Sequence, residues 1–299
     1  MGKRYNLDQS PLYMMQSKKR LAVALGVNLP WLQKASEESN FEYVRFKIFV
    51  KGKEREITKP VGIRDSVHKR VAHFLGSIEP PSFLFSGYKS RSHVDNALCH
   101  KGNPHVVTMD IRKFYDSSSD FWIMRLLLDS FKMSRDCAWM LSKILSASGC
   151  IPTGSSSSTI LAYWCHSDLF LSMAEYCKIR GIQFSLFVDD MTFSSQQKFD
   201  IEELISFVKR KLGSHGLQIK SRKTRVSNSD TLRGSSVTGV LLKQNMAMAS
   251  NKVWKELRLL GTVDGVNSGK LAGLRGYARY VQKRSSLVRL SNAHNNVLG

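Results

Sequence analysis

Residues 183–194, which read QFSLFVDDMTFS, decide the fold. Two short apolar runs, rich in residues that favour strands, meet at the adjacent carboxylates Asp189 and Asp190. The pattern predicts a β-hairpin with both acids at its turn. Two neighbouring negative charges in a poorly solvated place disfavour each other's ionisation, so a bound cation is the expected partner. A solvated turn is the alternative, because aspartate is common in turns.

A third acid follows another apolar stretch. Residues 105–111, HVVTMDI, predict a buried strand that ends near Asp110. If this strand lies beside the hairpin, three carboxylates converge on a site for two Mg²⁺ ions, which prefer oxygen ligands and share them with phosphates. The hypothesis requires Asp110 to lie within about a nanometre of the 189–190 pair, because magnesium–oxygen bonds are roughly 2 Å long.

The composition indicates a partner of opposite charge. The 299 residues carry a net charge of +21 with a pI of about 9.9, and 42% of them are hydrophobic. The apolar fraction excludes general disorder, and the charge favours a polyanion over small metabolites. Five cysteines without a C-x-x-C pair argue against a disulfide framework and a cysteine-type zinc site. With no recognisable secretory signal or membrane span, we expect a cytoplasmic protein with reduced thiols and no membrane partner.

The chain mixes strands and helices without a regular alternation, which predicts the α+β class. Residues 1–40 form an N-terminal helical extension, and residues 41–58 predict a hairpin with a basic rim, ended by Pro60. Apolar spacing predicts helices over 64–78, 121–147, 159–180, 200–212, 253–260 and 271–288, and a strand over 217–219.

Several motifs resemble those of reverse transcriptases, and of retron reverse transcriptases in particular. The Phe187–Asp190 segment FVDD and the Asp110–Tyr115 segment DIRKFY resemble the two catalytic aspartate motifs, and GCIPTGS at 149–155 is similar to the P-x-G loop beneath the template–primer. NALCH at 96–100 and VTG at 237–239 resemble two elements typical of retron enzymes. The motifs follow the family's order across residues 41–240.

The resemblance implies a right-hand polymerase: fingers and palm over 41–236, with an antiparallel palm sheet backed by helices, and a short, RNA-binding helical thumb over 237–299. It implies that Asp110, Asp189 and Asp190 hold two Mg²⁺ ions, with the Ile111 carbonyl as a further ligand.

Five residues are implied in nucleotide binding: Arg55, Tyr115, Thr153, Gly154 and Lys223. The resemblance places Arg55 on the triphosphate, Tyr115 against the sugar as a steric gate, and Lys223 near the departing pyrophosphate. Simpler alternatives are a solvated charge for Arg55, a core role for both Phe114 and Tyr115, and one more phosphate-facing base for Lys223.

Nine residues are implied in RNA binding: Asn96, His100, Val237, Thr238, Gly239, Lys252, Lys255, Arg275 and Arg279. The last four belong to basic helical faces that also carry Arg258, Lys283 and Arg284. For His100, a buried and hydrogen-bonded histidine is the alternative.

The implied function is RNA-directed DNA synthesis on a structured non-coding RNA (msr–msd). Priming from an internal guanosine 2′-OH would give branched RNA–DNA (msDNA), with dNTPs as substrates. A role in anti-phage defence with a separate effector protein is also implied, because 299 residues leave no room for a fused one. The alternatives are a non-catalytic RNA-binding scaffold or antitoxin, and a group II intron-like reverse transcriptase.

The chain departs from the family pattern at several positions. Phe187 replaces a tyrosine and Val188 an alanine, while Thr153 replaces a glutamine and Ser156 and Ser158 replace prolines. None of these changes touches the carboxylates, so activity is expected to survive. The serine run could instead be a flexible linker.

Overall fold

The computed structural model describes residues 4–37, 43–50, 52–261 and 268–295. They form two compact units, each built from separate stretches of chain. The first comprises Met1–Ser82, Ile111–Leu171 and Arg210–Gln218, and the second comprises Phe83–Asp110, Ser172–Lys209 and Ile219–Gly299. Because this division follows contacts and not chain order, segment boundaries at residues 40 and 236 remain predictions.

The first unit is mainly helical. Its predicted helix over 64–78 is observed as α3, whose residues Val67, Val71, Phe74 and Leu75 are buried together on one face. The stretch 121–147 is not one helix, because a π-helical turn and a bend interrupt it before α7. The elements of this unit are η1 (Leu7–Gln9), α1 (Lys18–Leu25), α2 (Leu29–Glu37), α3 (Gly62–Gly76), α5 (Phe114–Ser117), α6 (Asp120–Arg125), η2 (Leu126–Ser130), α7 (Arg135–Leu145) and α8 (Ser158–Cys165).

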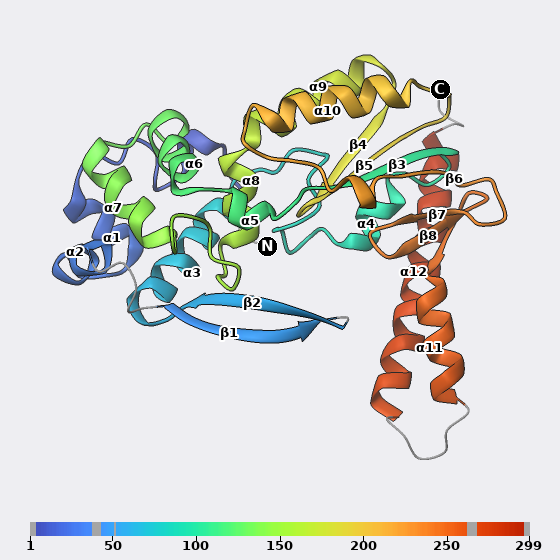
Figure 1. Cartoon of the computed structure of the whole chain (residues 1–299), viewed down its shortest axis with the longest axis horizontal. Helices are drawn as coiled ribbons and strands as arrows, with labels where there is room; N and C mark the ends of the chain where they lie inside the picture. Colours follow the sequence, from blue (N-terminus) through green and yellow to red (C-terminus); the bar gives the residue numbers. More distant parts are fainter. Residues whose placement is uncertain (1–3, 38–42, 51, 262–267, 296–299) are drawn as a thin grey trace. The chain divides into compact units, whose positions relative to one another are not determined.

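The predicted hairpin is also present in this unit. Strands β1 (Tyr43–Val50) and β2 (Lys53–Pro60) are antiparallel, and Val50 pairs with Lys53 across a tight turn in which Gly52 has φ +74°. Figure 1 shows the pair as a narrow two-stranded ribbon. Strand β2 ends at Pro60, which lacks the N–H that would continue the ladder.

The second unit contains a four-stranded antiparallel sheet. Its strands are β3 (His105–Asp110), β4 (Gln183–Phe187), β5 (Asp190–Ser195) and β6 (Arg225–Asn228), in the order β4-β5-β3-β6. The predicted hairpin and buried strand are therefore neighbours in one sheet. Helix α4 (His93–Leu98) belongs to this unit, and α9 (Ser167–Ile179) and α10 (Ile201–Gly213) cross the boundary between the units. Tyr176 of α9 stacks on Phe207 of α10, with ring centroids 3.7 Å apart.

The expected strand over 217–219 is reduced to a single bridged residue, Ile219. The Leu217 amide donates to the Leu212 carbonyl at 2.9 Å, and Gly216 has φ +69°, so Leu217 closes the C-terminal turn of α10. The next elements are η3 (Ser221–Lys223) and β6.

A small sheet precedes the C-terminal helices and was not predicted. Strands β7 (Ser235–Val237), β8 (Val240–Lys243) and β9 (Met246–Ala249) form an antiparallel meander. Each has only three or four residues, and the turn between β8 and β9 uses Gln244 and Asn245 at φ +47° and +58° without a glycine. Neither feature gives a strong hairpin signal.

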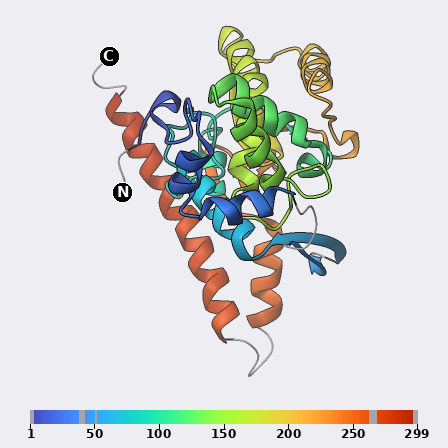
Figure 2. The same cartoon turned by 90° about the vertical axis from the view of Figure 1, so that its left-hand side faces the viewer.

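Helices α11 (Asn251–Gly261) and α12 (Ser268–Asn295) confirm the two predicted C-terminal helices. They lie side by side in both views (Figures 1 and 2). No helix in the described part of the chain is long and apolar enough to cross a bilayer. All five cysteines are free.

Candidate active site

The sheet register brings the three predicted carboxylates to one end of the second unit's sheet. Asp110 is the last residue of β3 and lies directly opposite Asp190, the first residue of β5. Directly opposed residues of an antiparallel pair have Cα atoms about 4.5–5.5 Å apart. Asp189 immediately precedes Asp190 in the chain. The requirement that Asp110 lie within about a nanometre of the pair is therefore met.

The turn that carries the pair is held in a strained conformation. Val188 has φ +60°, which is unfavourable for a β-branched residue. Its amide donates to the Ser86 hydroxyl at 2.8 Å, and Leu186 exchanges backbone hydrogen bonds with Phe83 and Phe85. These contacts fix the turn from the side, as expected where backbone strain serves a functional site.

Lys223 is the cation of this site. Its ammonium pairs with the carboxylate of Asp110, which is only 7% exposed, and the Lys220 amide donates to the Asp110 carbonyl at 2.7 Å. The hydrogen bond to Asp110 raises the pKa of Lys223, with further attraction from Asp110, Asp189 and Asp190. Lys223 therefore stays protonated and experiences the field of all three acids.

The residue types at this site, and the backbone positions that bring them together, fit divalent metal ions. Three carboxylates supply the hard oxygen ligands that Mg²⁺ prefers, and the strand register gathers them at one end of the sheet. The side chains are less converged than expected: no three histidine, cysteine, aspartate or glutamate side chains in the described residues form a group able to hold a metal ion. The Asp110 carboxylate pairs with Lys223 instead. A change of side-chain rotamer can redirect a carboxylate without moving its strand.

His100 supports the aspartate hairpin from within the core. It is fully buried, and its Nδ1 and Nε2 lie 2.7 and 2.6 Å from the hydroxyls of Ser194 on β5 and Ser185 on β4. A single imidazole thus links both strands of the hairpin. Of the two interpretations offered by the sequence, His100 is therefore the buried, hydrogen-bonded histidine.

We expect buried histidines to make folding acid-sensitive. Burial lowers the pKa of His68 to about 4, and that of His100 and His166 to about 3. The unfolded chain, with a histidine pKa of roughly 6.5, therefore binds protons that the folded chain excludes. The free energy of unfolding should be highest above pH 6.5 and should fall by roughly 1 kcal/mol per pH unit per histidine between pH 6.5 and 4.

Urea denaturation at pH 7.5, 6.5 and 5.5 measures this dependence. His100→Gln should flatten the slope, whereas His73→Gln, at an exposed histidine of α3, should leave it as in the wild type. An unchanged slope in the His100 variant would contradict the assignment.

The two retron-like motifs lie against each other in the second unit. The Asn96 side-chain amide points to the Thr238 hydroxyl at 3.4 Å, and that hydroxyl donates to the His93 carbonyl at 2.8 Å. Thr238 has φ +43° and Gly239 has φ +84°, so a left-handed turn between β7 and β8 presents Thr238 to α4.

Burial corrects the RNA-binding role expected for three of these residues. Asn96, His100 and Val237 have no exposed surface, so a direct contact with RNA is not available to them. They support the surface on which Gly239 is exposed and Thr238 half-buried. The basic residues Lys252, Lys255, Arg275 and Arg279 are all exposed on α11 and α12, whereas Arg284 pairs with Asp95.

The first unit joins the 152–158 loop to the β-hairpin that carries Arg55. Gly154 donates to the Thr58 carbonyl at 2.9 Å, and a Cβ there would lie 2.7 Å from Ile57 Cγ2, so only glycine fits. The Thr153 hydroxyl accepts from the Thr58 amide at 3.1 Å. Arg55 is exposed on β2.

The serines of this loop are structural and not a flexible linker. Ser158 is buried and bonded to Ser155 at 2.7 Å, and Ser157 bonds to the imidazole of His68 at 2.7 Å. Hydrogen bonds therefore fix this loop at Ser155, Ser157 and Ser158.

Phe114 and Tyr115 have different environments. Phe114 is buried against His166 and Phe170, whereas Tyr115 is half-buried and its hydroxyl lies 2.9 Å from that of Thr159. A core role for both rings is therefore excluded. The contacts of Tyr115 with a sugar, like those of Arg55, Thr153 and Gly154 with a nucleotide and of the Ile111 carbonyl with a metal, remain predictions.

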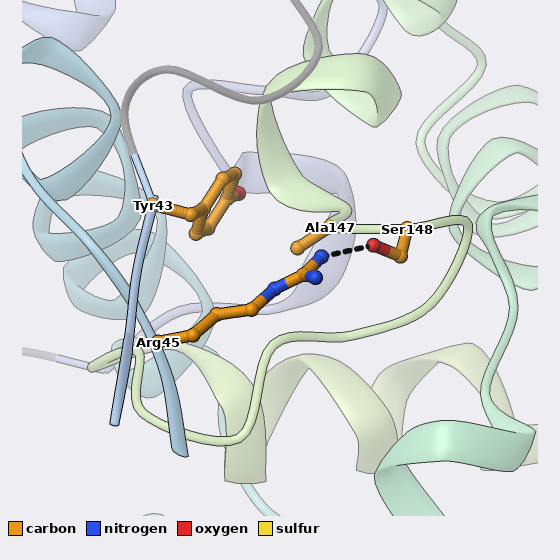
Figure 3. Close-up of a pocket in the computed structure, with 4 residues that line it drawn as sticks. All are labelled: Tyr43, Arg45, Ala147 and Ser148. Carbon is orange, nitrogen blue, oxygen red and sulfur yellow. Dashed lines mark hydrogen bonds between the residues drawn. The ribbon is translucent and has the colours of Figure 1, made fainter. Parts of the chain in front are cut away.

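The sequence did not single out Arg45. In the first unit it lines a pocket of about 530 Å³ with Tyr43, Ala147 and Ser148, and its guanidinium donates to the Ser148 hydroxyl at 2.5 Å (Figure 3). Ser148 has φ +51°, an unusual conformation for serine. The available signal was the basic rim of the hairpin, which does not distinguish Arg45 from its neighbours.

Comparison with known families agrees with this geometry. Residues 54–262 match the family described as reverse transcriptase (RNA-dependent DNA polymerase). The chain belongs to the reverse transcriptase family. The match covers more than half of the chain. It contains all three aspartates and the five residues implied in nucleotide binding, Arg55, Tyr115, Thr153, Gly154 and Lys223.

Curated relatives include two retron enzymes. The chain is 25% identical over 253 residues to the retron Se72 reverse transcriptase of Salmonella heidelberg (strain 579083-10), covering 80% of this chain and 65% of that protein. It is 23% identical over 282 residues to the retron Ec86 reverse transcriptase of Escherichia coli, covering 93% and 87%. The chain therefore spans slightly less than two thirds of the Se72 enzyme's length. These matches confirm the similarity to retron reverse transcriptases.

The fold is shared with a solved telomerase. An apo telomerase from Candida tropicalis, truncated from its C-terminal domain, superimposes with a TM-score of 0.50 at 11% identity, covering 75% of this chain and 61% of that one. At this identity the similarity concerns the fold alone. It agrees with the predicted right-hand polymerase architecture.

Proposed function

We propose that this reverse transcriptase is an RNA-directed DNA polymerase that copies part of a structured non-coding RNA into DNA. The observation that carries the proposal is the register that sets Asp110 opposite Asp190, with Asp189 adjacent and Lys223 paired to Asp110. Such a set of charges suits phosphoryl transfer, in which a protein supplies position and electrostatics and no covalent help.

Each charged group has a defined part in this reaction. The three aspartates would hold two Mg²⁺ ions, which supply activation of the primer hydroxyl and neutralisation of the leaving pyrophosphate when bound. Lys223, kept protonated by the aspartates, neutralises or protonates the departing phosphate. Tyr115 limits the space beside the sugar, and Arg55 grips the triphosphate with a planar guanidinium.

Retron-type priming is the finer part of the proposal. The similarity to two retron enzymes and the contact between Asn96 and Thr238 support it. We propose that the RNA is an msr–msd transcript, that a guanosine 2′-OH primes synthesis, and that the product is msDNA. The large positive charge suits such a partner. The proposal also includes a cytoplasmic location for this chain and a role in anti-phage defence with a separate effector protein.

Extension of a DNA primer annealed to RNA, with dNTPs and Mg²⁺, tests the polymerase proposal. We expect the wild-type chain to lengthen the primer. If wild type is as inactive as the Asp189→Asn/Asp190→Asn variant on its own RNA, the protein is an RNA-binding scaffold. Sequencing the nucleic acid that co-purifies with the chain tests the retron part, and a covalent RNA–DNA branch would distinguish it from a group II intron-like enzyme.

The Val237–Gly239 turn should matter more for priming than for extension. Thr238→Val removes the hydroxyl that donates to the His93 carbonyl, and Gly239→Ala places a side chain at φ +84°. We expect either change to reduce initiation on the cognate RNA about tenfold more than extension of an annealed primer. Equal losses in the two assays would show that this turn serves general activity and not recognition of the RNA.

A further inference from the structure

His93, the first residue of α4, touches three elements of the second unit. Its ring meets Phe187 edge-on at 6.3 Å and stacks on Tyr277 of α12 at 5.7 Å, with an interplanar angle of 19°. Its Nε2 lies 3.2 Å from the Tyr277 hydroxyl. Its carbonyl accepts the Thr238 hydroxyl. One residue thus connects the aspartate hairpin, the C-terminal helix and the 237–239 turn.

Helix α4 is held firmly enough to act as a support. The Ser92 hydroxyl accepts from the Asp95 amide, and the Asp95 carboxylate accepts from the Ser92 amide in return, which closes a capping box. Asp95 also pairs with Arg284 of α12, and Lys101 donates to the Ser285 carbonyl at 2.8 Å. Through these two contacts, a displacement of α12 would therefore displace α4 as well.

The other neighbour of His93 is part of the aspartate hairpin. Phe187 is the last residue of β4, lies opposite Asp190 and precedes the strained Val188–Asp189 turn. An edge-to-face ring contact contributes roughly 0.5–1.5 kcal/mol and depends on the geometry of the two rings. The position of the His93 ring therefore influences the position of Phe187 and of the turn that follows it.

We propose that His93 is a positioning residue that couples α12 to the Asp189–Asp190 turn, with Tyr277 and Phe187 as its two ring partners. In the sequence Tyr277 lies between Arg275 and Arg279, two of the exposed cations of α12. A nucleic-acid duplex bound by these cations would set the tilt of α12. Through the ring contacts, the tilt of α12 would then influence the position of the carboxylates. The inference rests on the proposed polymerase function and adds His93 and Tyr277, which lie outside every motif named above.

The ionisation of these groups agrees with a stack of neutral rings. Burial lowers the pKa of His93, although the carboxylate of Asp95 opposes this shift, and burial raises the pKa of Tyr277. At neutral pH the imidazole and the phenol therefore both stay uncharged. The coupling should consequently be insensitive to moderate salt, unlike the duplex contacts of Arg275 and Arg279.

Single-turnover addition of one dNTP to a DNA primer annealed to RNA tests this coupling. We expect His93→Ala to lower the rate of addition about tenfold, because small displacements of reacting groups are costly. The dissociation constant for the duplex and the concentration of dNTP giving half-maximal rate should stay within about twofold. His93→Phe and Tyr277→Phe, which keep the rings, should retain most of the rate.

A double-mutant cycle distinguishes coupling from general damage. His93→Ala and Tyr277→Ala combined should be little worse than either alone, because both break the same path. The controls are His73→Ala, at an exposed histidine of α3, and Tyr280→Ala, at a tyrosine of α12 that is 45% exposed. Both should behave as wild type.

Three results would overturn the inference: multiplicative losses in the double variant, a loss at His93 no larger than at His73, or a loss in His93→Phe as large as in His93→Ala. Thermal unfolding of each variant identifies those that fail to fold, and the phenylalanine variants then carry the test. An inactive wild type would refute the polymerase proposal itself, whereas an active wild type with an unaffected His93→Ala variant refutes only the coupling.

Discussion

Replacing Asp110 by asparagine is expected to lower DNA synthesis on RNA by at least about 10³-fold, with Asp189→Asn and Asp190→Asn similarly severe. Asparagine keeps the size of each side chain and removes its charge. Asp110 should be sensitive to this substitution for two reasons: its side chain is only 7% exposed, and it pairs with Lys223. Primer extension with Mg²⁺ and dNTPs measures the loss.

Binding must be separated from chemistry in this experiment. RNA affinity, followed by fluorescence anisotropy, should remain within about twofold of wild type or tighten slightly, because a negative charge has been removed from a basic surface. Asp230→Asn, at an exposed acid before β7, provides the matched control and should leave synthesis unchanged. Substantial synthesis by Asp110→Asn would show that the opposed pair with Asp190 is structural.

Truncating Tyr115 should weaken discrimination against ribonucleotides. We expect Tyr115→Ala to raise the efficiency of rNTP use relative to dNTP by roughly 10–100-fold, because the ring would no longer exclude the 2′-hydroxyl. Tyr115 is half-buried beside the buried Phe114, so truncation of Tyr115 opens space without emptying the core. Single-nucleotide incorporation with matched rNTP and dNTP gives the ratio.

Two further variants assign the effect to the ring. Tyr115→Phe keeps the ring and loses the hydroxyl that lies 2.9 Å from Thr159, and Thr159→Val removes the other partner. Both should discriminate as wild type does. If Tyr115→Phe relaxes selectivity as much as Tyr115→Ala, the hydrogen bond and not the bulk of the ring excludes ribose. If Tyr115→Ala leaves the ratio unchanged, another residue forms the gate.

The departures from the family pattern have physical explanations in the structure. Thr153 bonds to the backbone of β2, and Ser158 is buried and hydrogen-bonded within its loop. Phe187 lacks a tyrosine hydroxyl but packs its ring against His93. Thr153, Ser158 and Phe187 therefore each have a local partner.

Sequence alone was sufficient for the features that depend on local pattern. Two apolar runs that meet at Asp189–Asp190 and the apolar stretch before Asp110 predicted the hairpin and the buried strand. Their closeness was a hypothesis, based on the cation that neighbouring acids need. Helical periodicity placed α3, α11 and α12. The short strands β7–β9 were not predicted, because three or four residues show too little periodicity to distinguish a strand from a loop.

Only the tertiary structure decided which side chains meet. His100 reads as a candidate RNA contact in the sequence, yet it is buried between Ser185 and Ser194, and Arg284 looks like its basic neighbours, yet it pairs with Asp95. His93 lies in no recognised motif and gains its ring partners from segments almost a hundred and almost two hundred residues away. Pattern records what a residue prefers along its own strand or helix, whereas burial and pairing depend on the elements that packing brings beside it.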